Sequence, residues 1–147
     1  MKILNKNSEL CVGCRICELS CAFNKSNKFT PAKSRVWVMR DEEQGVFDPM
    51  ICRHCVRPPC EKACPVEGEK PISRDGKTGI VWLIPERGCI GCYECVRACP
   101  FGAIRIDPED GNVFKCDLCN GNPECVRWCP TGAIQFLERS TIGGKHR

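Results

Sequence analysis

Short apolar runs separated by turn-forming residues recur along this chain of 147 residues. In residues 72–83, two apolar-rich arms flank the sequence Gly-Lys-Thr-Gly, an arrangement that predicts a β-hairpin. Residues 104–114 repeat this plan, with alternating apolar and polar positions in the first arm. Residues 36–47 predict a third, longer pair of strands. We therefore expect β-hairpins to be the main extended elements.

Short helices are predicted between the hairpins by a repeated Cys-Pro motif. Residues 99–104 read Cys-Pro-Phe-Gly-Ala-Ile, residues 129–134 read Cys-Pro-Thr-Gly-Ala-Ile, and residues 64–68 are a weaker version. Proline ends the helix before it, because its ring cannot continue one, and the glycine lets the chain reverse into a strand. Each unit is therefore a loop, a short helix, a strand, a turn and a strand, which predicts an α+β fold.

Sixteen cysteines fall into four groups of four along the chain. Group one is Cys11, Cys14, Cys17 and Cys21; group two is Cys52, Cys55, Cys60 and Cys64; group three is Cys89, Cys92, Cys95 and Cys99; group four is Cys116, Cys119, Cys125 and Cys129. Group three and the proline after it have the C-x2-C-x2-C-x3-C-P spacing that ligates iron–sulfur clusters in bacterial ferredoxins. The middle gap is longer in groups two and four, and group one lacks the final proline, which we interpret as a variant helix end.

This cysteine content predicts cofactors that help to build the interior. At four thiolates per cluster, sixteen cysteines supply four [4Fe–4S] clusters with none left over. Gly13 and Gly91 allow two of the loops to close around inorganic sulfide. Aromatic residues are only 7% of the chain, so the core would be thin and we expect no stable fold without metal. His54 lies between two cysteines, but the thiolate set is complete without it, so we expect a place near a cluster or at the surface.

The formal net charge of +4 does not include the charge of bound clusters. Each oxidised cluster with four thiolates carries about −2, so four clusters would add about −8 and bring the total to about −4. The basic composition is therefore weak support for nucleic-acid binding.

Two other cysteine-rich classes remain as alternatives. A disulfide scaffold would require a secretory signal, and residues 1–8 contain no apolar stretch of that length. A zinc-stabilised binding module would also use C-x2-C pairs, although such tight quartets would offer competing ligands to one ion. No run approaches the length of a membrane helix, and reduced cysteines favour the cytoplasm, with export as a passenger on a partner's signal left open.

Residues 8–137 as a whole resemble the iron–sulfur electron-transfer subunits of molybdenum or tungsten pterin oxidoreductases, hydrogenases and carbon monoxide dehydrogenases. The resemblance rests on the order of the four groups, on Cys-Arg-His-Cys at 52–55 with Pro-Pro-Cys at 58–60, and on Lys-Cys-Asp-Leu-Cys at 115–119. The small size is most similar to the subunit that accompanies tungsten aldehyde oxidoreductases. The resemblance implies two ferredoxin-like modules related by pseudo-twofold symmetry, one of residues 1–50 with 101–147 and one of residues 51–100.

The same resemblance implies that the last cysteine of each group crosses to a partner group, so that groups one and four pair, as do groups two and three. The first cluster site would be Cys11, Cys14, Cys17 and Cys129; the second Cys116, Cys119, Cys125 and Cys21; the third Cys52, Cys55, Cys60 and Cys99; the fourth Cys89, Cys92, Cys95 and Cys64. We keep these names, first to fourth, throughout.

The expected function is electron transfer without catalysis. The chain has no room for a separate catalytic domain, and the resemblance implies a hetero-oligomer in which it relays electrons between a large catalytic subunit and a redox partner. A freestanding polyferredoxin is the alternative with the same chemistry. Residues 143–147 are expected to form a basic tail.

Overall fold

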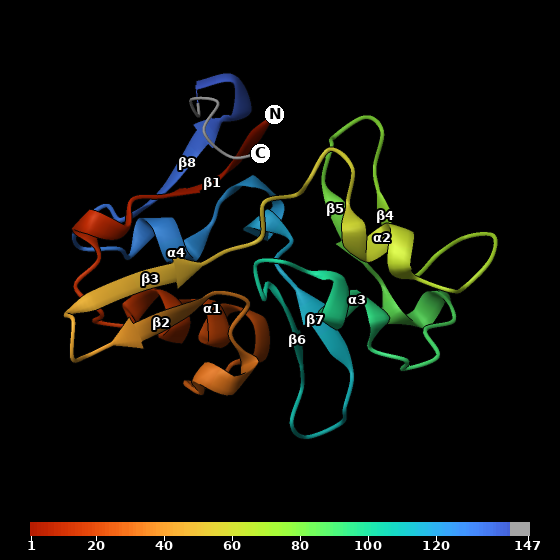
Figure 1. Ribbon diagram of the computed structural model, residues 1–147, viewed down its shortest axis with the longest axis horizontal. Helices are drawn as coiled ribbons and strands as arrows, with labels where there is room; N and C mark the ends of the chain where they lie inside the picture. Colours follow the sequence, from red (N-terminus) through yellow and green to blue (C-terminus); the bar gives the residue numbers. More distant parts are fainter. Residues whose placement is uncertain (142–147) are drawn as a thin grey trace.

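The computed structural model describes residues 1–141, in which short helices and strands are joined by long loops (Figure 1). The helices are α1 (Ile16–Ser26), α2 (Pro59–Ala63), α3 (Glu94–Ala98) and α4 (Glu124–Arg127). The strands are β1 (Lys2–Lys6), β2 (Trp37–Asp41), β3 (Val46–Met50), β4 (Ile72–Arg74), β5 (Val81–Leu83), β6 (Ile104–Ile106), β7 (Val113–Lys115) and β8 (Ile134–Glu138). The expected α+β fold of short helices and hairpins is confirmed, and the expected basic tail lies outside the described residues.

The strands of the described chain pair into four two-stranded antiparallel sheets. The pairs β2–β3, β4–β5 and β6–β7 are the three hairpins predicted from the apolar runs. The fourth sheet joins the two ends of the chain, with Lys2 opposite Glu138 and Lys6 opposite Ile134. Figure 1 shows β1 and β8 side by side, a long-range pairing that the local pattern did not predict.

Two clusters of buried side chains form the interior, and cysteine contributes to both. The first core consists of Leu4, Cys17, Cys21, Val36, Val38, Ile51, Leu118, Cys125 and Ile134. The second consists of Cys60, Ile72, Val81, Cys95, Ile104 and Val113. The division into modules stays a prediction, and the β6–β7 hairpin, which begins beyond residue 100, packs on the second core through Ile104 and Val113.

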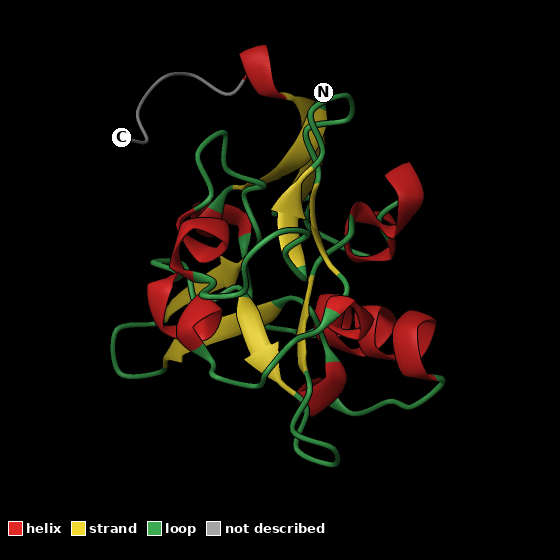
Figure 2. Ribbon diagram, turned by 90° about the vertical axis from the view of Figure 1, so that its right-hand side faces the viewer, coloured by secondary structure: helices red, strands yellow, loops and turns green. Residues whose placement is uncertain are grey.

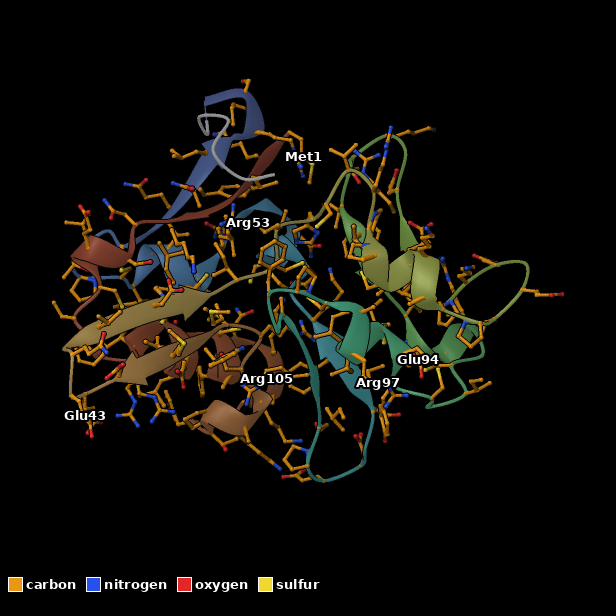
Figure 3. The ribbon with its side chains drawn as sticks, viewed as in Figure 1. Met1, Glu43, Arg53, Glu94, Arg97 and Arg105 are labelled. Atoms are coloured by element: carbon orange, nitrogen blue, oxygen red, sulfur yellow. The ribbon has the colours of Figure 1, made fainter. Side chains whose placement is uncertain are left out.

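The β6–β7 hairpin is also tied by polar contacts to residues 31–34, which precede Val36 of the first core. Arg105 of β6 donates to the carbonyl oxygens of Pro31 and Ser34 at 2.9 and 3.0 Å, and Figure 3 shows it on the side of the hairpin that faces β2 and α1. Lys33 and Asp107 form an ion pair of 2.7 Å with little exposure of either side chain. The hairpin therefore links the two cores.

The helices pack in two pairs, α1 with α4 and α2 with α3. Two groups of helices lie on either side of the strands in Figure 2. Helices α2 and α3 end immediately before Cys64 and Cys99, each of which is followed by proline. Helix α1 continues past Cys21 to Ser26, so the variant helix end expected for group one is confirmed.

Candidate metal centres

Three cavities in the described chain are each lined by four cysteines from two different groups. The cavity of the first site contains Cys11, Cys14, Cys17 and Cys129, that of the third site Cys52, Cys55, Cys60 and Cys99, and that of the fourth site Cys64, Cys89, Cys92 and Cys95. Their empty volumes, including space open to solvent, are about 290, 340 and 340 Å³. The structure thus brings together the crossed sets implied by the resemblance.

The cysteines of the second site also gather. Burial raises the pKa of Cys125 well above its ordinary value, and the neighbouring thiols of Cys116, Cys21 and Cys119 add to this effect. These four are the crossed set from groups four and one.

A backbone reversal occurs at the same point of all four cysteine loops. The residue before the second cysteine of each group has a positive φ: 69° at Gly13, 45° at His54, 67° at Gly91 and 59° at Leu118. Two loops therefore follow the expectation for glycine, whereas His54 and Leu118 adopt a conformation that costs a side-chain-bearing residue about 1–2 kcal/mol. Alignment of the four groups is the sequence signal that identifies these two residues.

The third cysteine of each group is buried and is the second residue of a helix. These residues are Cys17, Cys60, Cys95 and Cys125. Burial is the main cause that raises the pKa of Cys17 and of Cys60 to about 12, and it also raises the pKa of Cys95. Such thiols give up their protons readily only when a positive charge replaces them, which is what the iron atoms of a cluster supply.

In groups three and four, the fourth cysteine accepts hydrogen bonds from the turn that follows it. The N–H of Ala103 donates to Cys99 Sγ at 3.4 Å. Burial acts to raise the pKa of Cys129, but hydrogen bonds from the backbone of Ile134 and from Thr131 outweigh it and lower the pKa. Such donors suit a thiolate ligand. The four sets of residues therefore fit [4Fe–4S] clusters.

Comparison with known families agrees with this chemistry. Residues 43–139 match the family described as 4Fe-4S dicluster domain, and residues 8–24 match the one described as 4Fe-4S binding domain. The chain belongs to the 4Fe-4S dicluster family. It binds [4Fe–4S] clusters, and the expected resemblance to iron–sulfur subunits is confirmed.

Curated relatives carry names of oxidoreductase subunits. The aliphatic sulfonate oxidoreductase polyferredoxin-like subunit of Pyrococcus furiosus is 41% identical over 113 residues, which are 77% of this chain and 62% of the relative. A tetrathionate reductase subunit of Archaeoglobus fulgidus is 40% identical over 75% of this chain and 51% of its own length. The chain thus matches only about half to three-fifths of the length of these relatives.

A solved structure has a similar fold over nearly the whole chain. It is the active site complex BamBC of benzoyl coenzyme A reductase, with a TM-score of 0.57 and 26% identity over 99% of this chain and 83% of that one. This likeness supports the ferredoxin-like architecture of the 4Fe-4S dicluster family.

The four sites follow one another in the order first, second, third, fourth. Helix α1 carries thiols of the first and second sites, as does α4 together with Cys129 beyond its end, and α2 and α3, with the residues that follow them, carry thiols of the third and fourth. The second and third sites meet where the Cys52 thiol, after burial, contributes to raising the pKa of Cys116 to about 12. Each site thus adjoins the next, and we call this series the row.

A buried cation and a buried imidazole lie beside the third site. The Lys115 ammonium, with the residue 5% exposed, donates to the carbonyl oxygens of Val81 and Cys116 at 2.5 and 2.9 Å. His54 is fully buried, and its Nδ1 accepts a hydrogen bond from the Val81 N–H at 3.1 Å. Burial, followed by the charges of Lys115 and Arg139, lowers the pKa of His54 to about 3.

Opposite charges surround the second site. Asp117, next to Cys116, forms ion pairs with Lys25 at 2.8 Å and with Arg35 at 3.0 Å. These contacts fasten the loop of group four to α1 and to the segment before β2.

No three His, Cys, Asp or Glu side chains in residues 1–141 converge on a position for a single metal ion. None of the helices in this part of the chain is long and apolar enough to cross a membrane. The cytoplasmic location stays a prediction.

Proposed function

We propose that this chain is an electron-transfer subunit that carries four [4Fe–4S] clusters and relays electrons between a catalytic oxidoreductase subunit and a second redox partner. The observation that carries the proposal is the row of four sites, each with four cysteines. A single cluster would suffice to store an electron, whereas a row of neighbouring clusters suits the passage of electrons from one end of the row to the other.

The proposed ligands are the sixteen cysteines in their crossed sets. The sets of the first, third and fourth sites each line a common cavity, and the thiols of the second site act on one another electrostatically. When bound, the clusters supply one-electron redox chemistry. The protein would hold them through thiolates, directs N–H donors at Cys99 and Cys129, and keeps at least one thiol of each site in a helix.

Both ends of the row lie under exposed loops. Val12, in the loop of the first site, is 59% exposed, and Ile90, at the equivalent position of the fourth site, is 68% exposed. Apolar side chains beside an end cluster give a partner protein a surface on which to approach it. The two ends therefore suit electron entry and exit.

The names of the relatives suggest the catalytic partner. The cluster sites of this chain indicate electron transfer but do not indicate which enzyme the electrons reach. The relatives are named as subunits of a sulfonate oxidoreductase and a tetrathionate reductase, and the structural neighbour is part of a benzoyl coenzyme A reductase complex. A large oxidoreductase subunit, with a tungsten or molybdenum pterin enzyme such as an aldehyde oxidoreductase as the specific candidate, completes the hetero-oligomer.

Anoxic purification from the native source tests both the four clusters and the catalytic partner. We expect about sixteen iron and sixteen acid-labile sulfide per chain, as four clusters require, together with a co-purifying large subunit. A zinc-loaded chain with little iron would refute electron transfer. A chain with four clusters that purifies alone would instead support the freestanding polyferredoxin.

A further inference from the structure

His54 has a hydrogen-bond donor that nothing in the described protein accepts. Its Nε2 is buried and has no partner, while the ring lines the cavity formed by Cys52, Cys55, Cys60 and Cys99. A buried donor without an acceptor is unfavourable, because it has given up its hydrogen bonds to water and gained none. Such a cost, in a residue with the added strain of a positive φ, calls for an acceptor in the cavity.

The hydrogen bond at the other ring nitrogen fixes the tautomer. Nδ1 accepts a hydrogen bond from the Val81 N–H at 3.1 Å and therefore carries no proton, so the proton of the ring lies on Nε2. The same Val81 accepts from Lys115 through its carbonyl oxygen, so strand β5 is held by both side chains. Nε2 is thus a donor, and Nδ1 is not free to bind iron.

We propose that His54 donates its Nε2–H to a sulfur of the third cluster and thereby raises the reduction potential of that cluster. The inference rests on the proposed cluster ligands. Reduction adds one negative charge to the cluster, so a donor to sulfur stabilises the reduced form more than the oxidised form. Four cysteines already line the cavity, which leaves His54 the role of a positioning and tuning residue rather than a ligand.

The fourth site provides the internal comparison. Its cavity is lined mainly by apolar side chains such as Val66, Ile72 and Leu83. Tyr93, which also lines it, already donates its hydroxyl to the Gly111 carbonyl oxygen at 2.9 Å. The effect of His54 is therefore specific to the third cluster.

Two substitutions of His54 distinguish the effect of the Nε2–H donor from that of the Nδ1 acceptor. In His54→Asn the amide oxygen can still accept from the Val81 N–H, but the side chain is too short to place a donor where Nε2 lies. In His54→Gln the amide nitrogen reaches that place. Anoxic redox titrations followed by EPR would compare both with the wild type, and Cys60→Ser would assign the signal of the third cluster.

We expect His54→Asn to lower the potential of the third cluster by at least a tenfold change in the ratio of reduced to oxidised cluster, which is 59 mV for a one-electron couple. His54→Gln should retain most of the wild-type potential, and the fourth cluster should not change. An unchanged third potential in His54→Asn, with all clusters present, overturns the inference.

A measurement on the unmodified protein covers the case in which the variants lose iron. Pulsed EPR of wild-type protein with ¹⁵N-labelled histidine should show a nitrogen coupling and an exchangeable proton coupling at the reduced third cluster. Absence of both couplings overturns the hydrogen bond. Absence of the cluster itself, seen as a deficit of iron and sulfide in the wild type, would overturn the proposed ligands instead, so the two failures are distinguishable.

Discussion

Glu18 is a buried carboxylate on α1 whose removal should loosen the first core. The side chain is 2% exposed and lies next to Cys17. Its Oε1 accepts from the Val38 N–H at 2.7 Å, and its Oε2 accepts from Arg15 at 2.7 and 3.1 Å. The carboxylate therefore joins the helix of the first and second sites to strand β2.

The expected loss of folding free energy differs between Glu18→Ala and Glu18→Gln. Glu18→Ala leaves the buried Val38 N–H without an acceptor, which costs about 1–3 kcal/mol, and it removes one buried methylene group worth about 0.8 kcal/mol. The Arg15 side chain is 37% exposed, so water takes over part of its role and the ion pair adds little. We expect a total loss of about 3 kcal/mol for Glu18→Ala. Glu18→Gln keeps an oxygen for Val38 and should cost about 1 kcal/mol.

Unfolding releases the clusters and is therefore irreversible, so the assay measures the rate of unfolding rather than an equilibrium free energy. Anoxic unfolding in guanidinium, followed by loss of visible cluster absorbance, should be faster in Glu18→Ala, by up to tenfold for each 1.4 kcal/mol. Glu18→Gln should fall between Glu18→Ala and the wild type. Equal rates for all three proteins would show that the contact to β2 does not hold the first core together.

Three further perturbations test other parts of the structure. Cys129→Ser should impair the first cluster in EPR while leaving the third and fourth intact; loss of the fourth instead would contradict the crossed ligands. Gly13→Ala should lose more iron than Gly91→Ala, because both have positive φ but an added Cβ would lie 2.5 Å from the Phe47 ring at Gly13 and in open space at Gly91; equal iron contents would contradict this. Leu4→Ala, at a residue 2% exposed, should cost about 2–5 kcal/mol and speed cluster release, and an unchanged rate would mean that the terminal sheet contributes nothing.

Local sequence patterns predicted the elements whose causes are local. The hairpin at 72–83 and the helix end before Cys99 depend on turn residues and proline, which act within a few positions. The pairing of β1 with β8 depends on contacts between the two ends of the chain, and no short-range signal encodes them.

The candidate sites also combine features that the local sequence predicted with features that depend on long-range packing. Cysteine spacing predicted the cluster chemistry, since four thiolates in a tight loop have few other uses. For His54 the sequence predicted a place near a cluster or at the surface, and the structure places it buried in the lining of the third site. The choice between the two was not predicted, because the buried positions of His54 and Lys115 arise from strands β5 and β7 packing beside group two. A histidine between two cysteines gave no indication in the sequence of which atoms would surround it.

Short helices constrain the spacing between the two proposed cluster sites of each pair. The third and fourth cysteines of every group are four residues apart. In group one both lie in α1, which places them about 6 Å apart along the helix at 1.5 Å per residue, and in the other groups the fourth cysteine follows the end of the helix by one or two residues. Each helix thus constrains the step between two sites. The step from the second to the third site has no such helix. It depends on Lys115, which contacts both Val81 beside the third site and the backbone of Cys116 in the second. Substitutions at this junction should therefore change electron transfer along the row more than substitutions within a helix pair.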